Sequence, residues 1–447
     1  GCCLLPLNHP LDQFAVIVAV LAVKLAGNGT VNQYKKTAKE ELKSKHFTKD
    51  DLKRIYRDMV VIREFETMLQ LVKTTGGYNG VEYNNPGPAH LSAGQEAAAV
   101  GMAYMLDIND FIFGSHRSHG EILAKGLRAI ELLDDKSLEK IMNEFWDGAT
   151  VNVAKKAYKG GSVKELGIRF LLYGALAEIF ARTTGFNKGL GGSMHTFFTP
   201  FGIYPNNAIV GGSGSIAVGA ALYKKVNRKP GIVVANIGDA SMARGPVWEG
   251  MTFAAMDQFK QLWEGDMKGG LPVIINIMDN QYGMGGQTRG ETMGFDFAAR
   301  IGAGVNPEQM HAERVDGFNP LAVIDAYRRK KAILEKEKAG PVLLDVLTYR
   351  YSGHSPSDAS SYRTKEEVEA WEAQDCIVSY GKELIDAGVA TQADLDAVTK
   401  EIKEIMFDTF KLSIDDELSP RMDLHKEPEL LGTMMFSNQS IDSPSVT

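Results

Sequence analysis

Three residues that could bind a magnesium ion stand just after two apolar runs. Asp239 follows IVVANI (232–237), within the segment GDASMARG (238–245), and Asn280 and Tyr282 follow the apolar run PVIINIM. Magnesium prefers oxygen ligands and usually combines one or two carboxylates with phosphate oxygens and water. A carboxylate, an amide oxygen and a backbone carbonyl from these residues would leave room for a diphosphate. The small residues beside Asp239 would let that diphosphate approach the backbone.

A structural role accounts for the same residues. Asp239 could cap the helix that follows it, and Asn280 could lie in a turn. Spacing alone leaves both interpretations open.

The glycine-rich stretch GGSGSIAVG (211–219) is a second candidate phosphate site. Gly212, Gly214 and Ala217 fit a dinucleotide-binding fingerprint. No clear strand precedes the stretch, and the first acidic residue after it is Asp239, already at the end of the next strand. We therefore interpret it as a closely packed helix start that could still offer amide groups to phosphate. A nicotinamide-dependent oxidoreductase is the weaker alternative, and it predicts nicotinamide binding.

Two segments place histidine beside small residues: SHRSHG (115–120) and SGHSPSD (352–358). Arg117 in the first could grip a phosphate with two hydrogen bonds. Histidine titrates near neutrality and suits proton transfer. Each histidine taken singly is equally compatible with a structural role.

The elements that must position these residues form a repeating pattern. From residue 205 onward, continuous apolar strands at IVVANI, PVIINIM and PVLLDVL alternate with amphipathic helices. This pattern predicts an α/β fold with a parallel central sheet and helices on both faces. Ligands bind at the carboxyl ends of such strands, where GDAS, DNQYGMG and TYRYSGHSPSD begin.

The earlier half of the chain is predicted to be mainly helical. A capping box at Thr48–Asp51 starts a long helix, where we expect ordered structure to begin. Further helices are predicted over 93–106, 135–149 and 163–185, with a short strand at DFIFGS. After residue 364 we expect two polar helices. The resulting division is an extension of uncertain order (1–46), one domain (47–412) and a tail or linker (413–447).

Composition excludes several classes of protein. Of the 447 residues 44% are hydrophobic and 23% charged, as in ordinary globular enzymes. The net charge is −7 and no basic patch is visible, which argues against a nucleic-acid partner. Three cysteines form neither a disulfide framework nor a metal spacing, so a reducing compartment is expected. The apolar stretch 14–27 contains Lys24 and is too short to cross a bilayer, so no membrane segment is predicted.

Taken in order, the motifs resemble one enzyme family. AHLSAGQEAAAVG, HRSHGEILAKG, AEIFARTTGFNKGLGGSMH, AIVGGSGSIAVGAAL, GDAS, DNQYGMG and TYRYSGHSPSDASSYRTKEEVEAW are similar to the alpha subunit of the thiamine-diphosphate-dependent dehydrogenase component of 2-oxoacid dehydrogenase complexes. The resemblance covers about residues 48 to 410. It implies the thiamine-diphosphate-binding fold.

The resemblance assigns a role to each matching residue. Asp239 and Asn280 match the metal-ligand positions, and Tyr282 matches the residue that lends a backbone carbonyl. The other matches are His116 and Arg117 at the diphosphate, Ala208 and Val210 at the aminopyrimidine end, Ala240 and Ser241 after the metal aspartate, and His354 and His119 as catalytic histidines, with His354 also contacting the cofactor.

The implied activity is oxidative decarboxylation of a 2-oxo acid, with pyruvate favoured, using thiamine diphosphate and Mg²⁺. The acyl group would pass to a lipoyl arm on an acyltransferase core. The family's activating glutamate comes from a beta-type subunit, so the resemblance implies such a partner, in an α2β2 assembly or as a fused C-terminal half. The expected location is the bacterial cytoplasm, or the mitochondrial matrix if the source is eukaryotic.

The chain departs from the family pattern at several points. GDG is replaced by GDA and NN by DN, His116 stands where tyrosine is usual, and insertions occur around 128–165 and at LWEGDMKGG. Two alternatives follow from the motifs. One is an acetoin dehydrogenase alpha subunit, and the other is a non-catalytic scaffold paralogue that no longer binds the cofactor.

Overall fold

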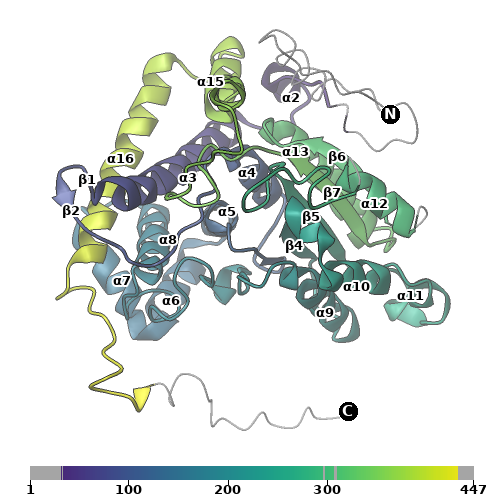
Figure 1. Ribbon diagram of the computed structural model, residues 1–447, viewed down its shortest axis with the longest axis horizontal. Helices are drawn as coiled ribbons and strands as arrows, with labels where there is room; N and C mark the ends of the chain where they lie inside the picture. The colour runs from purple at the N-terminus through teal and green to yellow at the C-terminus, as the bar shows by residue number, and fades with distance from the viewer. Residues whose placement is uncertain (1–31, 33, 295–296, 307–309, 431–447) are drawn as a thin grey trace.

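A five-stranded parallel sheet lies at the centre of one half of the computed structural model (Figure 1). The structure describes residues 32, 34–294, 297–306 and 310–430. The strand order is β3–β4–β5–β7–β6, and the strands are β3 (Phe111–Phe113), β4 (Val233–Gly238), β5 (Val273–Asp279), β6 (Glu313–Asp316) and β7 (Val342–Leu347). The predicted α/β fold with a parallel sheet is confirmed.

Helices cover both faces of this sheet. Val233, Ala235 and Ile237 of β4 share a hydrophobic core with α9 (Gly212–Val226), α10 (Gly245–Ala254) and α12 (Ala298–Val305). The alternate residue Val234 belongs to a second core, which includes α4 (Glu96–Tyr104) and α13 (Pro320–Glu335). Successive side chains of a strand point to opposite faces. Both sets are apolar, which explains the continuous hydrophobic runs in the sequence.

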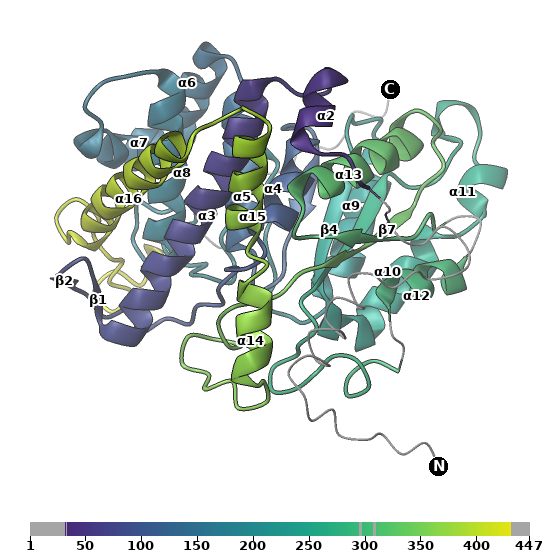
Figure 2. The ribbon, with the colours of Figure 1, turned by 90° about the horizontal axis from the view of Figure 1, so that it is seen from above.

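A layer of long helices packs beside the sheet (Figure 2). Its members are α3 (Lys49–Thr75), α5 (His119–Leu132), α8 (Val163–Ile179) and α16 (Gln392–Ile414). The predicted capping box of α3 is present, because the Thr48 and Asp51 side chains each accept the other's backbone N–H. Helices α14 (Lys365–Glu372) and α15 (Cys376–Asp386) precede α16. Three helices therefore follow residue 364, where two were predicted.

Ordered structure extends beyond both predicted limits. Helix α2 (Ala38–Lys43) precedes residue 48, and the backbone N–H of Ala38 donates to Glu383 of α15 (2.6 Å). At the other end, Tyr173 of α8 contacts the buried hydroxyl of Ser419 (2.6 Å). Residues just after 412 therefore pack on the domain. The apolar stretch 14–27 and the end of the tail (431–447) lie outside the described residues.

The two insertions lie away from the carboxyl ends of the strands. The first forms α6 (Asp135–Glu144), η1 (Phe145–Gly148), α7 (Ala149–Ala154) and η2 (Lys155–Ala157), which pack on α8. The second follows α11 (Gln258–Gln261) and contains η5 (Gly265–Met267). It enters the amino end of β5, where the Gly270 N–H donates to the Lys338 carbonyl (2.7 Å). The longer interval between Asp239 and Asn280 therefore does not separate the ends of β4 and β5.

Several elements were not predicted. Strand β6 has the sequence ERVD, which carries no apolar pattern, and it forms because it pairs with β7. A hairpin of β1 (Gly77–Tyr78) and β2 (Val81–Glu82) and the turns η3 (Thr199–Phe201) and η4 (Asp239–Ala243) complete the fold. The helical segment between β4 and β5 is divided in two, since α10 ends at Ala254 before α11 begins at Gln258.

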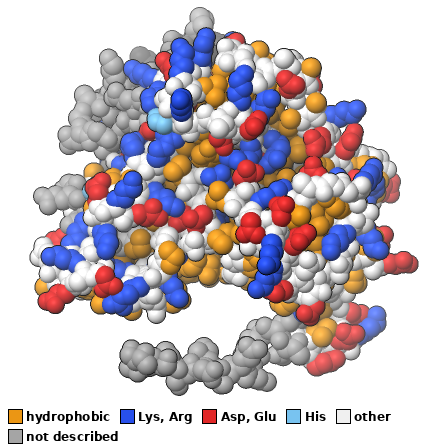
Figure 3. Space-filling model, turned by 180° about the vertical axis from the view of Figure 1, so that it is seen from behind, with side chains coloured by type: hydrophobic (Ala, Val, Ile, Leu, Met, Phe, Trp, Pro, Cys, Tyr) orange, Lys and Arg blue, Asp and Glu red, His pale blue; other side chains and the backbone are white. Residues whose placement is uncertain are grey.

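Charges are mixed over the face shown in Figure 3, where acidic and basic side chains alternate with apolar ones. Within the described part of the chain, no helix has the length and apolar character needed to span a bilayer.

Candidate functional site

A cavity of about 450 Å³ opens at the carboxyl ends of β4, β5 and β7. Every site residue that the family resemblance assigned lines it, apart from His119: His116, Arg117, Ala208, Val210, Asp239, Ala240, Ser241, Asn280, Tyr282 and His354. The second candidate phosphate site, with Gly212, Gly214 and Ala217, does not line this cavity. The loops that carry them are separated widely in sequence. They meet because parallel strands end at the same edge of the sheet.

The three oxygen-bearing residues lie together on one wall. Asp239 is buried at the start of η4, and its carboxylate accepts a hydrogen bond from the Thr288 hydroxyl. Burial raises the pKa of Asp239 to about 6, although the Thr288 hydrogen bond and the nearby charge of Arg350 act in the opposite direction. A carboxylate, an amide and a carbonyl form the all-oxygen donor set that Mg²⁺ requires, so these residues fit such an ion.

The structural alternative for these residues is only partly right. Helix α10 has Arg244 as its N-cap residue, so the interpretation of Asp239 as its cap is wrong. Asn280 does lie in a turn, since its Oδ1 accepts the backbone N–H of Tyr282 (3.2 Å) while its Nδ2 donates to Gln95 (3.1 Å).

The two departures from the family motif have little effect on the cavity. Even a Cβ added to Gly283 would stand 3.5 Å from the methyl group of Ala240, which is an ordinary van der Waals contact, so Ala240 does not crowd that loop. Asp279, the first residue of DN, does not line the cavity. Its carboxylate accepts from Arg314 (3.1 Å), which also binds Asp345 (2.8 Å). Neither change removes a predicted ligand.

Two buried guanidinium groups also line the cavity. Arg117 donates to the carbonyls of Leu91 and His354 (both 2.8 Å), and Arg350 donates to the carbonyls of Tyr282 (3.3 Å) and Gly283 (2.9 Å). Burial, reinforced by Arg350, lowers the pKa of Arg117 to about 9. Neither group forms an ion pair within the described part of the protein, and Nε of Arg350 has no hydrogen-bond partner there. An anion such as a diphosphate would supply the negatively charged partner that these two guanidinium groups lack.

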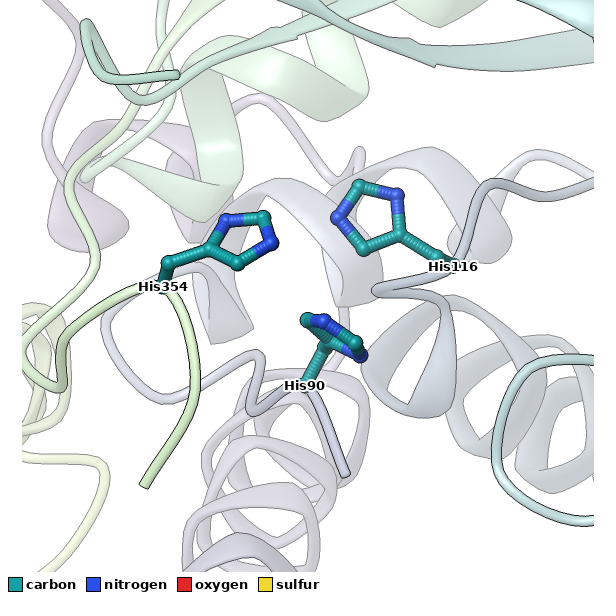
Figure 4. Close-up of side chains that lie close together, drawn as sticks. All are labelled: His90, His116 and His354. Carbon is teal, nitrogen blue, oxygen red and sulfur yellow. The ribbon is translucent and has the colours of Figure 1, made fainter. Parts of the chain in front are cut away.

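Three histidines converge in the cavity (Figure 4). The rings of His90 and His116 are 4.7 Å apart between centroids, those of His90 and His354 4.9 Å, and those of His116 and His354 5.5 Å. Burial and the neighbouring Arg117 lower the pKa of His90 to about 3, that of His116 to about 2 and that of His354 to about 4. The imidazoles are therefore uncharged at neutral pH.

His119 lies behind the cavity wall. Its Nδ1 contacts Glu66 of α3 (3.1 Å), and its Nε2 contacts the Ser193 hydroxyl (2.8 Å). All three side chains are buried. Ser193 precedes Met194, which lines the cavity.

A buried carboxylate holds the loop that carries Ser193 through hydrogen bonds to its backbone. Glu178 of α8 accepts backbone N–H groups from Asn187 (2.7 Å), Gly189 (2.8 Å), Gly191 (2.6 Å) and Gly192 (3.3 Å). A carboxylate that accepts several backbone donors orders the segment that supplies them. Glu178 and His119 together hold this part of the wall.

Sequence reasoning missed several cavity residues, notably His90, Gln95, Glu121, Met194, Arg244 and Arg350. His90 and Arg350 lie inside motifs that were noticed, AHLSAGQEAAAVG and TYRYSGHSPSD. No spacing rule marks them, because their neighbours in the cavity come from other segments.

Glu121 should make the stability of the folded chain depend on pH. Burial raises the pKa of Glu121 from its usual 4.5 to about 8, and its Oε2 has no hydrogen-bond partner among the described residues. The folded state thus binds a proton that the unfolded state releases, so stability falls as pH rises from 4.5 to 8, by about 1.4 kcal/mol per pH unit. Glu121→Gln should match the parent in urea unfolding at pH 5 and be the more stable at pH 8.

The exposed Glu139→Gln is the matched control, and its unfolding curve should follow the parent at both pH values. If the free energies of unfolding of Glu121→Gln and the parent changed equally between pH 5 and pH 8, Glu121 would not be protonated in the folded chain.

The chain is similar to known proteins along most of its length. A family model described as "Dehydrogenase E1 component" matches residues 57–162 and 162–420. The chain is 30% identical over 371 residues to the pyruvate dehydrogenase E1 component subunit alpha of Rhizobium meliloti (strain 1021), covering 83% of this chain and 87% of the relative. The corresponding subunit of Rickettsia conorii is 28% identical over 380 residues (85% and 96%). The mitochondrial type II subunit of Ascaris suum is 30% identical over 377 residues (84% and 78%).

Proposed function

Because the chain belongs to the dehydrogenase E1 component family, as an alpha-type chain of a 2-oxoacid dehydrogenase, we propose that it catalyses thiamine-diphosphate-dependent oxidative decarboxylation of pyruvate. The cavity carries this proposal, because it joins a buried oxygen-donor wall to two guanidinium groups that lack ion-pair partners among the described residues. The relatives' printed names favour pyruvate over other 2-oxo acids and over acetoin.

The chain's residues divide into two binding groups. Asp239, Asn280 and the carbonyl of Tyr282 would hold Mg²⁺, while Arg117, Arg350 and His116 would hold the diphosphate. When bound, thiamine diphosphate supplies an electron sink for the charge left as carbon dioxide departs.

The histidines support this chemistry in different ways. His354 lines the cavity as an uncharged imidazole and can accept a proton from a group bound there. A catalytic role for His119 remains a prediction. Its burial between Glu66 and Ser193 favours a positioning role instead, in which it fixes the wall that carries Met194.

Exposed apolar side chains at the rim of the cavity suggest that a beta-type partner binds there. Val210 lines the cavity yet is 44% exposed, and its neighbour Ile209 is 72% exposed. Exposed apolar side chains at a site rim often mark a protein interface. We propose that a beta-type subunit, in an α2β2 assembly or as a fused half, covers them and supplies the activating glutamate. A lipoyl-bearing acyltransferase would then accept the acyl group.

The test combines this chain with a beta-type subunit, thiamine diphosphate and Mg²⁺, and measures reduction of an artificial electron acceptor. Pyruvate should give the highest kcat/KM, above branched-chain 2-oxo acids and acetoin, with no turnover when the cofactor is omitted. A higher value for acetoin would assign the chain to acetoin dehydrogenases. Absence of both turnover and cofactor binding would favour the scaffold alternative.

A further inference from the structure

The three cavity histidines form a cluster that the proposed reaction does not account for as a unit. His90 precedes α4, His116 lies between β3 and α5, and His354 follows β7. One ring nitrogen from each lies within 4.8 Å of the others. Figure 4 shows the three rings turned toward a common space. Three separate segments thus present nitrogen donors to one point.

We propose that His90, His116 and His354 bind a nitrogen-preferring transition-metal ion, of which Zn²⁺ is the type, at a site distinct from the oxygen ligands of Mg²⁺. Three histidines with a fourth position open to water are a known zinc ligand set. Zinc binds imidazole nitrogen at about 2.0–2.1 Å, so the rings must move together slightly. Side chains that border a cavity have room for that movement.

Unsatisfied polar atoms point to a missing ligand at this cluster. Nδ1 of His90 and Nδ1 of His354 are buried and have no hydrogen-bond partner among the described residues. A buried polar atom without a hydrogen-bond partner destabilises the folded chain. Binding of a metal ion, with the hydrogen bonds of its bound water, would recover part of that cost.

The ligand atoms of the cluster select the kind of ion. Arg117 donates to the backbone carbonyl of His354, and Arg350 lines the same cavity, so their positive charge opposes every divalent cation equally. Mg²⁺ and Ca²⁺ are bound chiefly by oxygen ligands, which the three imidazoles do not supply. Strong coordination by imidazole suits zinc, copper and nickel even without a carboxylate ligand.

Occupancy of this site would exclude the cofactor. His116 and Arg117 are adjacent, and both line the space proposed for the diphosphate. This consequence rests on the proposed function, whereas metal binding itself does not. The expected relationship is competition between the transition metal and thiamine diphosphate.

Binding is tested on the full chain after removal of metals, with Co²⁺ as a spectroscopic probe and Zn²⁺ in calorimetry. We expect one equivalent of each, with tetrahedral Co²⁺ absorption bands that Zn²⁺ abolishes. His116→Tyr should lower the affinity at least as much as the loss of an outer-shell partner, about 10–100-fold. If His116→Tyr unfolds, as judged by circular dichroism, His354→Asn provides the same test.

His46→Gln is the control, because His46 is exposed and contacts Glu41 rather than the cavity. It should bind Co²⁺ and Zn²⁺ like the parent. The proposed site would be overturned if Co²⁺ bound to the parent gave no tetrahedral bands, or if the folded cavity variants kept full metal affinity. It would also be overturned if His46→Gln lost as much metal affinity as the cavity variants.

Competition needs a separate measurement. Saturating thiamine diphosphate with Mg²⁺ should weaken the apparent Zn²⁺ affinity by about 10-fold or more, while Zn²⁺ should displace the cofactor to the same degree, as linkage requires. Unchanged Zn²⁺ affinity would overturn the competition and leave the metal site standing. Because Zn²⁺ binding is measured without substrate, an inactive chain would not obscure it.

Discussion

Asp239→Asn should abolish most Mg²⁺-dependent binding of thiamine diphosphate and most turnover with a beta-type partner. The substitution keeps the shape of the side chain but removes the charge that would bind the metal. Loss of an outer-shell partner at a metal site costs about 10–100-fold, and loss of the only carboxylate ligand should cost at least that much. Because burial already raises the pKa of Asp239 to about 6, the neutral side chain should not destabilise the fold.

Asp279→Asn is a closely matched control for that experiment. Asp279 ends β5 as Asp239 follows β4, and it is also buried, but it faces Arg314 rather than the cavity. Arg314 keeps Asp345 as a partner in this variant. Calorimetry of cofactor binding at several Mg²⁺ concentrations should separate the two variants. Equal losses in both would mean that the metal does not bind at Asp239.

Arg117→Met should weaken thiamine diphosphate binding strongly while leaving the Mg²⁺ ligands in place. The buried guanidinium has no ion-pair partner among the described residues, so a bound diphosphate would be its main source of compensating charge. Removing one member of a buried, hydrogen-bonded charge pair costs about 2–5 kcal/mol, or roughly 30-fold or more in the dissociation constant. Calorimetric titration with the cofactor at saturating Mg²⁺ measures this change.

The control is Arg228→Met, in which an exposed arginine loses its ion pair with Asp266. Its cofactor affinity should equal that of the parent. If Arg117→Met also bound the cofactor normally, the diphosphate would have to lie elsewhere in the cavity, and Arg350 would be the next residue to test.

Local patterns in the sequence were sufficient to predict the sheet and the loops around its carboxyl edge. Runs such as IVVANI and PVIINIM are apolar on both faces apart from one asparagine each, and their alternation with helices favours strands buried in a parallel sheet. Parallel strands then place the residues that follow them at one edge. The resemblance to the family added roles for Arg117, His116 and His354, and the structure brings these residues into the same cavity.

Tertiary packing alone decided the use of the remaining residues. His119 stands in the same motif as Arg117, yet helix α5 turns it away from the cavity toward Glu66 and Ser193. Asp279 is next to Asn280, yet it turns to Arg314, a residue of the unpredicted strand β6.

The sequence by itself therefore determined the fold class, the edge of the sheet where the cavity lies and most of the predicted residues that line it. Only the tertiary structure decided that His90 joins His116 and His354, and that Arg350 lines the same cavity. The physical reason is that hydrophobic periodicity specifies an element and its buried face locally. Contacts between loops depend on how distant elements pack, which no short stretch of sequence encodes.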